Sequence, residues 1–203
     1  MNKKFRGILI GMILGDATLR VRKDTQYPNT WHNVLSIKHG EKQKEYIEYK
    51  ANLIHSMFGG KPITVRPINN SGYPGYLIYK SHKYFRILYK RMYKNGKKTF
   101  TSQVLNWLTP EGIAIWYMDD GSLCAKKRNG KIHAYDLYLN TYSTKEENEV
   151  IIQYFQDAYD IHFTLSKNKG LYRIRCGTKE ARKFIELVKP YIIPSMQYKI
   201  DMQ

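Results

Sequence analysis

The sequence is poor in cysteine, in acidic residues and in long hydrophobic runs. Its two cysteines, Cys124 and Cys176, are too few for a disulfide framework and too scattered for a zinc site. Its six histidines show no paired spacing on a helix, which also argues against zinc. The longest apolar run, residues 8–14, is far shorter than the roughly 20 residues that cross a bilayer. These absences disfavour disulfide-rich, zinc-dependent and membrane-spanning proteins.

The N-terminus shows no targeting signal. Residues 1–4 include two lysines, but no small-residue cleavage site follows a proper apolar region. The chain starts almost at its first apolar helix, so we expect no N-terminal extension. We expect an intracellular protein of a mitochondrion or another organelle, or of a bacterial or phage cytoplasm, with no membrane partner.

Basic residues outnumber acidic residues two to one. The chain has 34 Lys and Arg against 17 Asp and Glu, a formal net charge of +17 and a pI of about 9.7. A field of this sign and size attracts nucleic acid. A generic basic RNA-binding protein, such as a ribosomal component, would account for this charge.

One order of elements occurs twice along the chain, as helix, two strands, helix, two strands, helix. The pattern predicts an α+β fold of two pseudo-symmetric αββαββα subdomains, residues 1–97 and 109–203, joined by a linker at 98–108. Turn-forming residues separate the strands, including Pro28 and Asn29 in the first loop. The elements predicted for the first half are 4–15, 17–23, 31–39, 41–57, 62–67, 75–80 and 82–94. Those predicted for the second half are 110–119, 121–127, 133–142, a helix from 143 or 144 to 159, 161–167, 170–176 and 178–189.

The predicted strands place basic and polar side chains on one face. In residues 19–22, leucine and valine share one face and two arginines share the other. A solvated face usually mixes both signs of charge, whereas these faces carry almost no Asp or Glu. We therefore expect a nucleic-acid contact surface, because arginine and asparagine can read base edges from a β-ribbon. The candidate DNA-binding residues are Arg20, Arg22, Lys38, Arg66, Lys80, Lys126, Arg128, Tyr138, Asn140, Lys167, Arg173 and Arg175.

Two apolar helices end in acidic residues, at Asp16 and Asp120. Carboxylates are disfavoured at a helix C-terminus because the macrodipole is negative there, so a compensating cation is expected. Mg²⁺ is a hard ion that prefers carboxylate, carbonyl and water oxygens. A single such aspartate is usually a turn or cap residue. Its repetition in register instead favours a shared metal site that acts on a phosphodiester.

Glycines and lysines near the acidic ends support that interpretation. Gly11 and Gly15 lie four residues apart on one helical face and would allow close helix packing. We expect Ala114 to permit the close approach from the second helix. Lys98 follows Asp16 by 82 residues, and Lys199 follows Asp120 by 79. Each lysine is either a solvated surface group or a group that stabilises charge at a phosphate.

Four segments together resemble the LAGLIDADG homing endonuclease family, in its monomeric form with two motifs. They are residues 11–17 (GMILGDA), 97–99 (KKT), 108–121 (LTPEGIAIWYMDDG) and 189–199 (KPYIIPSMQYK). The resemblance covers nearly the whole chain. It implies that the two motif helices pack at the centre and that two antiparallel sheets form a DNA-binding saddle.

The resemblance also implies an activity, with residues in particular roles. Asp16 and Asp120 would be the catalytic carboxylates that bind metal, and the backbone carbonyls of Gly15 and Asp119 would add ligands. Lys98 and Lys199 would be the basic residues of the active sites. The cofactor would be Mg²⁺, with Mn²⁺ substituting and Ca²⁺ binding without cleavage. A monomer with no obligate protein partner would cut both strands of a long asymmetric DNA target and leave short 3′ overhangs.

Two alternatives use the same fold. A group I intron maturase would bind intron RNA and could lose a catalytic aspartate. A non-catalytic DNA-binding protein would need neither carboxylate. The presence of both Asp16 and Asp120 favours the nuclease over each of them.

Overall fold

The computed structural model describes residues 1–23, 31–70, 72–168 and 170–202. The chain divides into two compact units. The N-terminal unit comprises residues 1–5 and 16–98, and the C-terminal unit comprises residues 6–15 and 99–203. Helix α1 (Lys3–Leu14) therefore lies mostly in the C-terminal unit, whereas the sequence boundaries place it in the first subdomain. The predicted loop residues Pro28 and Asn29, and the turn residues Ser71 and Lys169, lie outside the described residues.

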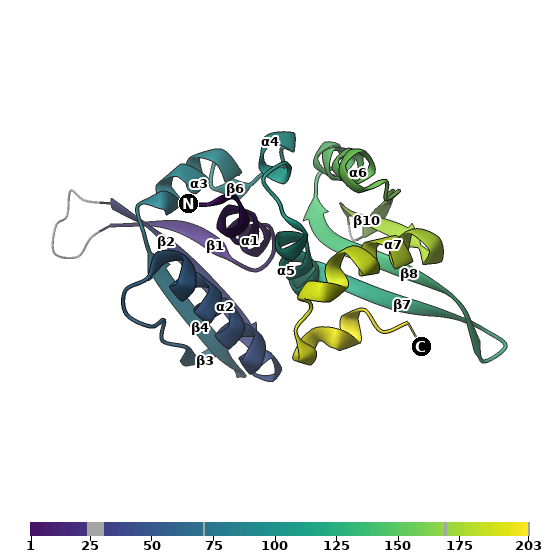
Figure 1. Ribbon diagram of the computed structural model, residues 1–203, viewed down its shortest axis with the longest axis horizontal. Coiled ribbons are helices and arrows are strands. Elements are labelled where there is room, and N and C mark those ends of the chain that lie inside the picture. The colour runs from purple at the N-terminus through teal and green to yellow at the C-terminus, as the bar shows by residue number, and fades with distance from the viewer. Residues whose placement is uncertain (24–30, 71, 169, 203) are drawn as a thin grey trace. The chain divides into compact units, whose positions relative to one another are not determined.

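The N-terminal unit is an antiparallel sheet with helices on one face. The strand order is β1-β2-β4-β3. Helix α2 packs on β4 and β2, and α3 packs on β2 and β1, so both helices lie on one face of the sheet and neither covers the opposite, open face (Figure 1). The elements are β1 (Thr18–Lys23), β2 (Trp31–Gly40), a 3₁₀ turn (Glu41–Gln43), α2 (Lys44–Phe58), β3 (Arg66–Asn70), β4 (Tyr73–Ser81), α3 (Tyr84–Met92), β5 (Tyr93–Lys94) and β6 (Lys97–Lys98).

The C-terminal unit repeats that topology. Its sheet has the order β7-β8-β10-β9, again antiparallel, with α6 and α7 packed against it. The elements are α4 (Ser102–Leu105), α5 (Pro110–Asp120), β7 (Gly121–Arg128), β8 (Lys131–Ser143), α6 (Lys145–Tyr159), β9 (Thr164–Asn168), β10 (Leu171–Gly177), α7 (Thr178–Val188) and two 3₁₀ turns (Lys189–Tyr191, Pro194–Lys199).

Local sequence explains where the main helices begin and end. The Thr109 hydroxyl accepts a hydrogen bond from the Gly112 N–H at 3.2 Å, and Pro110 occupies the first helical position of α5. Thr144 and Glu147 form a reciprocal capping box at the start of α6. Helix α2 closes at Gly59, where φ is +61°, a conformation that glycine adopts without strain.

Several parts of the chain differ from the sequence prediction: β9 begins at Thr164 and not at residue 161, and α3 ends at Met92, after which residues 93–94 form β5. Strand β3 begins at Arg66 and not at residue 62, because its pairing with β4 ends at the Arg66–Leu77 pair. Pro67 is tolerated within β3 because this is an edge strand and the missing N–H need not pair. The segment predicted as a linker at 98–108 contains helix α4, which begins with Thr101 as its cap.

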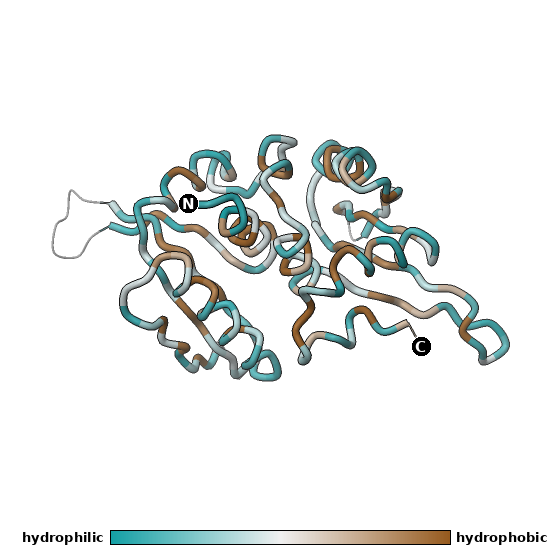
Figure 2. The backbone as a smooth tube through the Cα atoms, viewed as in Figure 1, coloured by the Kyte–Doolittle hydropathy of each residue, from teal (hydrophilic) through white to brown (hydrophobic). Residues whose placement is uncertain are grey.

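The core of each unit follows from its hydrophobic pattern. Every residue of α1 from Gly7 to Leu14 is buried, and so is every residue of α5 from Gly112 to Met118. Figure 2 shows hydrophobic and hydrophilic residues mixed along α2, as expected of a helix with one face on a sheet. Within the described part of the chain, no helix has both the length and the apolar character needed to cross a bilayer.

Candidate active site

Helices α1 and α5 pack closely within the C-terminal unit because glycines line their contact. A Cβ atom on Gly11 would overlap the Gly112 carbonyl, and one on Gly112 would overlap the Gly7 carbonyl. A Cβ atom on Gly15 would overlap the carboxylate of Asp119. The close approach predicted for Gly11 and Gly15 is confirmed. The glycine that permits it on α5 is Gly112, at the start of the helix, and not Ala114.

Asp120 is held from both its side chain and its backbone. The indole Nε1 of buried Trp116 donates to Asp120 Oδ2 at 3.2 Å, one helical turn away. The Asn140 amide donates to the Asp120 carbonyl at 2.8 Å, and the Arg173 guanidinium donates to Asn140 Oδ1 at 2.9 Å. Asn140, predicted as a DNA contact, thus supports the backbone at Asp120. Such supporting hydrogen bonds orient a carboxylate for metal binding.

Lys199 binds the carbonyl groups at the end of α5. Its ammonium donates to Met118 O at 2.6 Å, to Gly121 O at 3.0 Å and to Asp119 O at 3.2 Å. The buried Tyr117 hydroxyl, whose pKa burial raises far above its usual value, donates to the Lys199 carbonyl at 2.7 Å. The sequence predicted a divalent cation to offset the helix dipole here. The structure shows that Lys199 supplies a positive charge at this helix end.

Asp16 lies in the N-terminal unit, immediately after α1. Its side chain is 42% exposed, and its Oδ2 lies 3.6 Å from Nδ1 of His39. His39 is on β2, on the face that carries Leu35 and Ile37, and is almost fully buried. Sequence reasoning did not select His39, because one histidine within an alternating apolar strand has the pattern of a core residue.

Lys98 is half-buried in β6, where it pairs with Tyr93. The Tyr93 hydroxyl accepts the Leu19 N–H of β1 at 3.0 Å, so the short β5–β6 ribbon is fastened to the main sheet. Lys98 therefore sits on a fixed element, which suits a residue with a defined role better than a mobile surface position would.

The acidic groups and carbonyls at these helix ends are chemically suited to a divalent metal ion. Asp16 and Asp120 offer carboxylate oxygens, and Gly15 and Asp119 offer backbone carbonyls. An all-oxygen set of this kind is what Mg²⁺ prefers. Asp16 is exposed enough to accept an ion and its water shell, and Asp120 is oriented by its neighbours. The residues at each helix end therefore offer the oxygen ligands that a hard divalent ion takes.

The open face of the N-terminal sheet carries four of the predicted DNA-binding residues. Arg20 pairs with Val34 in the β1–β2 register, and Lys38 and Arg66 both pair with Leu77, so all lie on the face without helices. Arg22 shares this face and lies 5.9 Å from the centroid of the Tyr79 ring. The face is basic, as the sequence predicted.

The open face of the C-terminal sheet is more neutral. Asp136 lies on this face. Its Oδ2 forms an ion pair with the Lys126 ammonium at 2.9 Å, and its Oδ1 lies 3.8 Å from Nε of Arg175. Burial by itself would raise the pKa of Asp136, but these cations outweigh it and hold that pKa below its usual value. Arg173 lies 4.0 Å from the Tyr138 ring centroid. Arg128 is exposed near the tip of the β7–β8 hairpin.

Two predicted contact residues lie on the wrong face. Lys80 pairs with Leu35 on the helix-covered side, and its ammonium donates to the Gly59 carbonyl at the end of α2 at 3.0 Å. Lys167 pairs with Tyr172 and shares the helix side with Leu165. These positions do not favour DNA contact. Residues on the open faces that the sequence reasoning did not select are Ser36, Tyr79, Ser122, Thr164 and Ser166.

Comparison with known proteins agrees with this geometry. The model of the LAGLIDADG DNA endonuclease family matches residues 6–184. This chain belongs to that family. It is 35% identical over 126 residues to a probable intron-encoded DNA endonuclease 3 of Mycosarcoma maydis, which covers 59% of this chain and 88% of the relative. It is 26% identical over 208 residues to the cytochrome b mRNA maturase bI2 of Debaryomyces hansenii, covering 98% and 74%.

A solved structure supports the family assignment. The homing endonuclease I-WcaI bound to its DNA recognition sequence superposes with a TM-score of 0.80 at 28% identity, over 100% of this chain and 88% of that one. The predicted family and the α+β fold with antiparallel sheets are thereby confirmed.

Proposed function

We propose that this protein is a site-specific endonuclease of the intron-homing type. It hydrolyses both strands of a long asymmetric DNA duplex, requires Mg²⁺, and leaves short 3′ overhangs. The observation that carries the proposal is the construction of the end of α5. There, Trp116 and Asn140 hold Asp120 while Gly15, the residue after α1, packs against the Asp119 side chain. Asp16 follows Gly15 in the chain, so we expect both acidic helix ends to serve one reaction centre.

Each residue has a proposed part in the chemistry. Asp16 and Asp120 hold the metal, with backbone carbonyls at Gly15 and Asp119 as further ligands. A bound divalent ion would activate water and stabilise charge on the phosphate and the leaving oxygen. Trp116 fixes one oxygen of Asp120, which directs the other toward the ion. Lys98 stabilises negative charge that develops at the phosphate.

The open sheet faces are proposed to bind the duplex. Arg20, Arg22, Lys38 and Arg66 offer phosphate and base contacts in the N-terminal unit. Arg173 and Arg175 do so in the C-terminal unit, after rearrangement of their contacts with Asn140 and Asp136. Neither sheet requires a partner chain for this, so we propose that the protein acts as a monomer.

A cleavage selection tests the proposal. The full chain is incubated with a randomised DNA library in Mg²⁺, in Mn²⁺, in Ca²⁺ and in EDTA, and the cut ends are sequenced. We expect one long motif with short 3′ overhangs in Mg²⁺ and Mn²⁺, and no cutting in Ca²⁺ or EDTA. Cutting without sequence preference, or cutting that persists in EDTA, would contradict it.

A maturase function is the second candidate. It is favoured by the match to a cytochrome b mRNA maturase along 98% of this chain. Acceleration of group I intron splicing by the Asp16→Asn variant, which is not expected to cut DNA, would establish this second activity. Tight binding to DNA without any effect on splicing would remove it.

A further inference from the structure

A chain of buried polar groups leads away from Asp16 into the core of the N-terminal unit. Nε2 of His39 lies 3.0 Å from the ammonium nitrogen of Lys50 on α2. Nδ1 of the same ring lies 3.1 Å from Oε1 of Gln43 and 3.6 Å from Oδ2 of Asp16. The imidazole therefore stands between a cation and a candidate catalytic carboxylate.

Lys50 is an unusual residue for its position. It is fully buried among the residues that α2 packs against the sheet, and its nitrogen lies 4.3 Å from the centroid of the Tyr46 ring. An ammonium group is costly to bury unless hydrogen bonds and charge partners compensate. An apolar side chain would fill this site at lower cost, so the lysine calls for a reason beyond packing.

The contacts of His39 define its hydrogen position. An ammonium has three donors and no acceptor, so the ring nitrogen that faces Lys50 must accept, and Nε2 carries no hydrogen. The hydrogen then lies on Nδ1, where the carbonyl oxygen of Gln43 also requires a donor. A doubly protonated ring would set an N–H against the ammonium. Both ends of the ring thus select one tautomer.

We propose that Lys50 fixes His39 in the tautomer with its hydrogen on Nδ1, so that His39 donates toward Asp16 and does not bind metal. His39 and Lys50 are then positioning residues. The N–H is shared between Gln43 Oε1 and one oxygen of Asp16, which leaves the other Asp16 oxygen for the divalent ion. The 3.6 Å separation is longer than a hydrogen bond, and such contacts commonly tighten only in the substrate complex. The role of Asp16 in this inference rests on the proposed function.

In the C-terminal unit, the strand and helix that correspond to β2 and α2 are linked without charge. There Thr141 of β8 donates to Oδ1 of fully buried Asn148 on α6 at 2.6 Å, and the Asn148 amide donates to the Thr144 carbonyl at 2.8 Å. This link between strand and helix satisfies its groups without an ion. The fold therefore does not demand a lysine beneath the sheet, which favours a role for Lys50 at Asp16.

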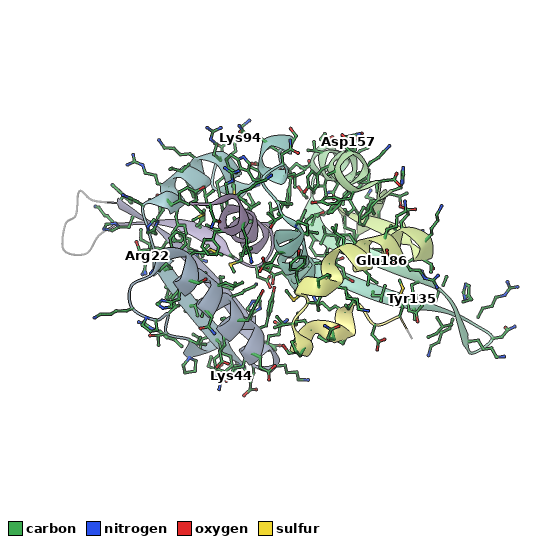
Figure 3. All side chains as sticks on the ribbon, in the orientation of Figure 1. Arg22, Lys44, Lys94, Tyr135, Asp157 and Glu186 are labelled. Carbon is green, nitrogen blue, oxygen red and sulfur yellow. The ribbon has the colours of Figure 1, made fainter. Side chains whose placement is uncertain are left out.

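The tautomer can be measured directly. Long-range ¹H–¹⁵N spectra of the full chain, without metal or DNA, separate protonated from unprotonated ring nitrogens, and His39→Gln assigns the signals. We expect protonated Nδ1 and unprotonated Nε2, unchanged when Mg²⁺ is added. Lys50→Met leaves Gln43 alone to favour Nδ1, so a population with the hydrogen on Nε2 should appear, while Lys50→Arg should preserve the original tautomer. The matched control is Lys44→Met, an exposed lysine at the start of the same helix (Figure 3).

The Mg²⁺ dependence of cleavage tests whether His39 and Lys50 position Asp16. We expect Lys50→Met to raise the Mg²⁺ concentration for half-maximal cleavage about tenfold, as loss of supporting hydrogen bonds does at other metal sites. Lys50→Arg and Lys44→Met should stay near wild type. A wild-type hydrogen on Nε2, no spectral change in Lys50→Met, or an unchanged Mg²⁺ requirement would overturn the proposal. An uncut target would instead count against the proposed function, because the spectra do not depend on cleavage.

Discussion

The N-terminal unit carries 19 lysines and arginines against five acidic residues, whereas the C-terminal unit carries 15 against 12. In the C-terminal unit, cations pair with acids, as Lys126 does with Asp136 and Lys183 with Asp160. In the N-terminal unit, no Asp or Glu occurs between Glu48 and the end of the unit. The repeated fold thus carries two different surfaces, and attraction for phosphate is concentrated in the first.

The units also differ in how they hold their acidic residues. Asp16 is approached by a buried histidine backed by a buried lysine. Asp120 is held by an indole and an amide, with Lys199 on the neighbouring carbonyls. One topology therefore places two carboxylates in corresponding positions while their surroundings diverge. Variants that affect one unit and spare the other can test each part of this comparison.

The largest effect is expected at the glycine contact in the C-terminal unit. Gly112→Leu places side-chain atoms against the backbone of Gly7, which cannot move aside without displacing α1. Overpacking a core commonly costs about 1–3 kcal/mol and can cost more, so we expect the urea midpoint to fall well below that of wild type. Urea unfolding followed by circular dichroism measures it. Gly40→Ala, where no atom lies within reach of the new Cβ, is the control. Equal midpoints would refute the close packing.

The charge difference predicts unequal salt dependence of DNA binding. Each phosphate contact contributes about 0.9 to the slope of log affinity against log salt. The pair Arg20→Gln and Lys38→Gln should lower the slope by nearly two. Lys126→Gln and Arg175→Gln should lower it less, because Asp136 already pairs with them. Fluorescence anisotropy over a range of KCl concentrations measures both pairs. Equal reductions would show that the two sheets contribute alike.

Lys199 should matter for stability as well as for chemistry. Lys199→Met leaves carbonyls at the end of α5 without their charged donor, and such hydrogen bonds contribute about 1–3 kcal/mol. We expect a lower midpoint of thermal unfolding than in wild type. The exposed neighbour Lys189→Met should leave it unchanged. If Lys199→Met and wild type have the same midpoint of thermal unfolding, Lys199 does not stabilise the end of α5.

The smallest effect concerns Asp136. Because its pKa is lowered in the folded protein, its ion pairs stabilise the fold above its unfolded pKa of about 4 and are lost as the pH falls through the lower folded value. Asp136→Asn should therefore cost about 1 kcal/mol at pH 7 and almost nothing near pH 2. Chemical denaturation at both pH values measures this. A stability cost of Asp136→Asn that grows on acidification would contradict a lowered pKa of Asp136 in the folded protein.

The order of elements could be predicted from the sequence because it rests on local signals. Thr109 with Pro110 marks the start of α5, and alternation of apolar residues marks β1, β2 and β8. The start of β3 could not be predicted in the same way, because it depends on where the neighbouring strand stops pairing. Periodicity identifies a strand, but it does not show at which residue the strand stops pairing with its neighbour.

The site could be predicted only in part, for a related reason. The sequence singled out Asp16 and Asp120 as candidates, and the glycines of the helix contact, because their chemistry or size is distinctive. It missed His39 and Lys50, since their role depends on contacts between residues 11 positions apart. It put Lys80 on the DNA face, although a period of two from Ile78 places it on the helix side. A lysine stem can cover apolar surface while its ammonium reaches a helix end, so charge alone did not reveal the face.

Cleavage and binding by three aspartate variants test the central claim most directly. On the target recovered from the library, Asp16→Asn and Asp120→Asn should each reduce double-strand cleavage at least about a hundredfold, because each removes a metal-binding charge. Their affinity for the duplex should stay within a few-fold of wild type. Asp119→Asn should retain most of the cleavage, since only the carbonyl of that residue is assigned to the metal. Full cutting by Asp16→Asn or Asp120→Asn, or loss of cutting in Asp119→Asn alone, would contradict the account.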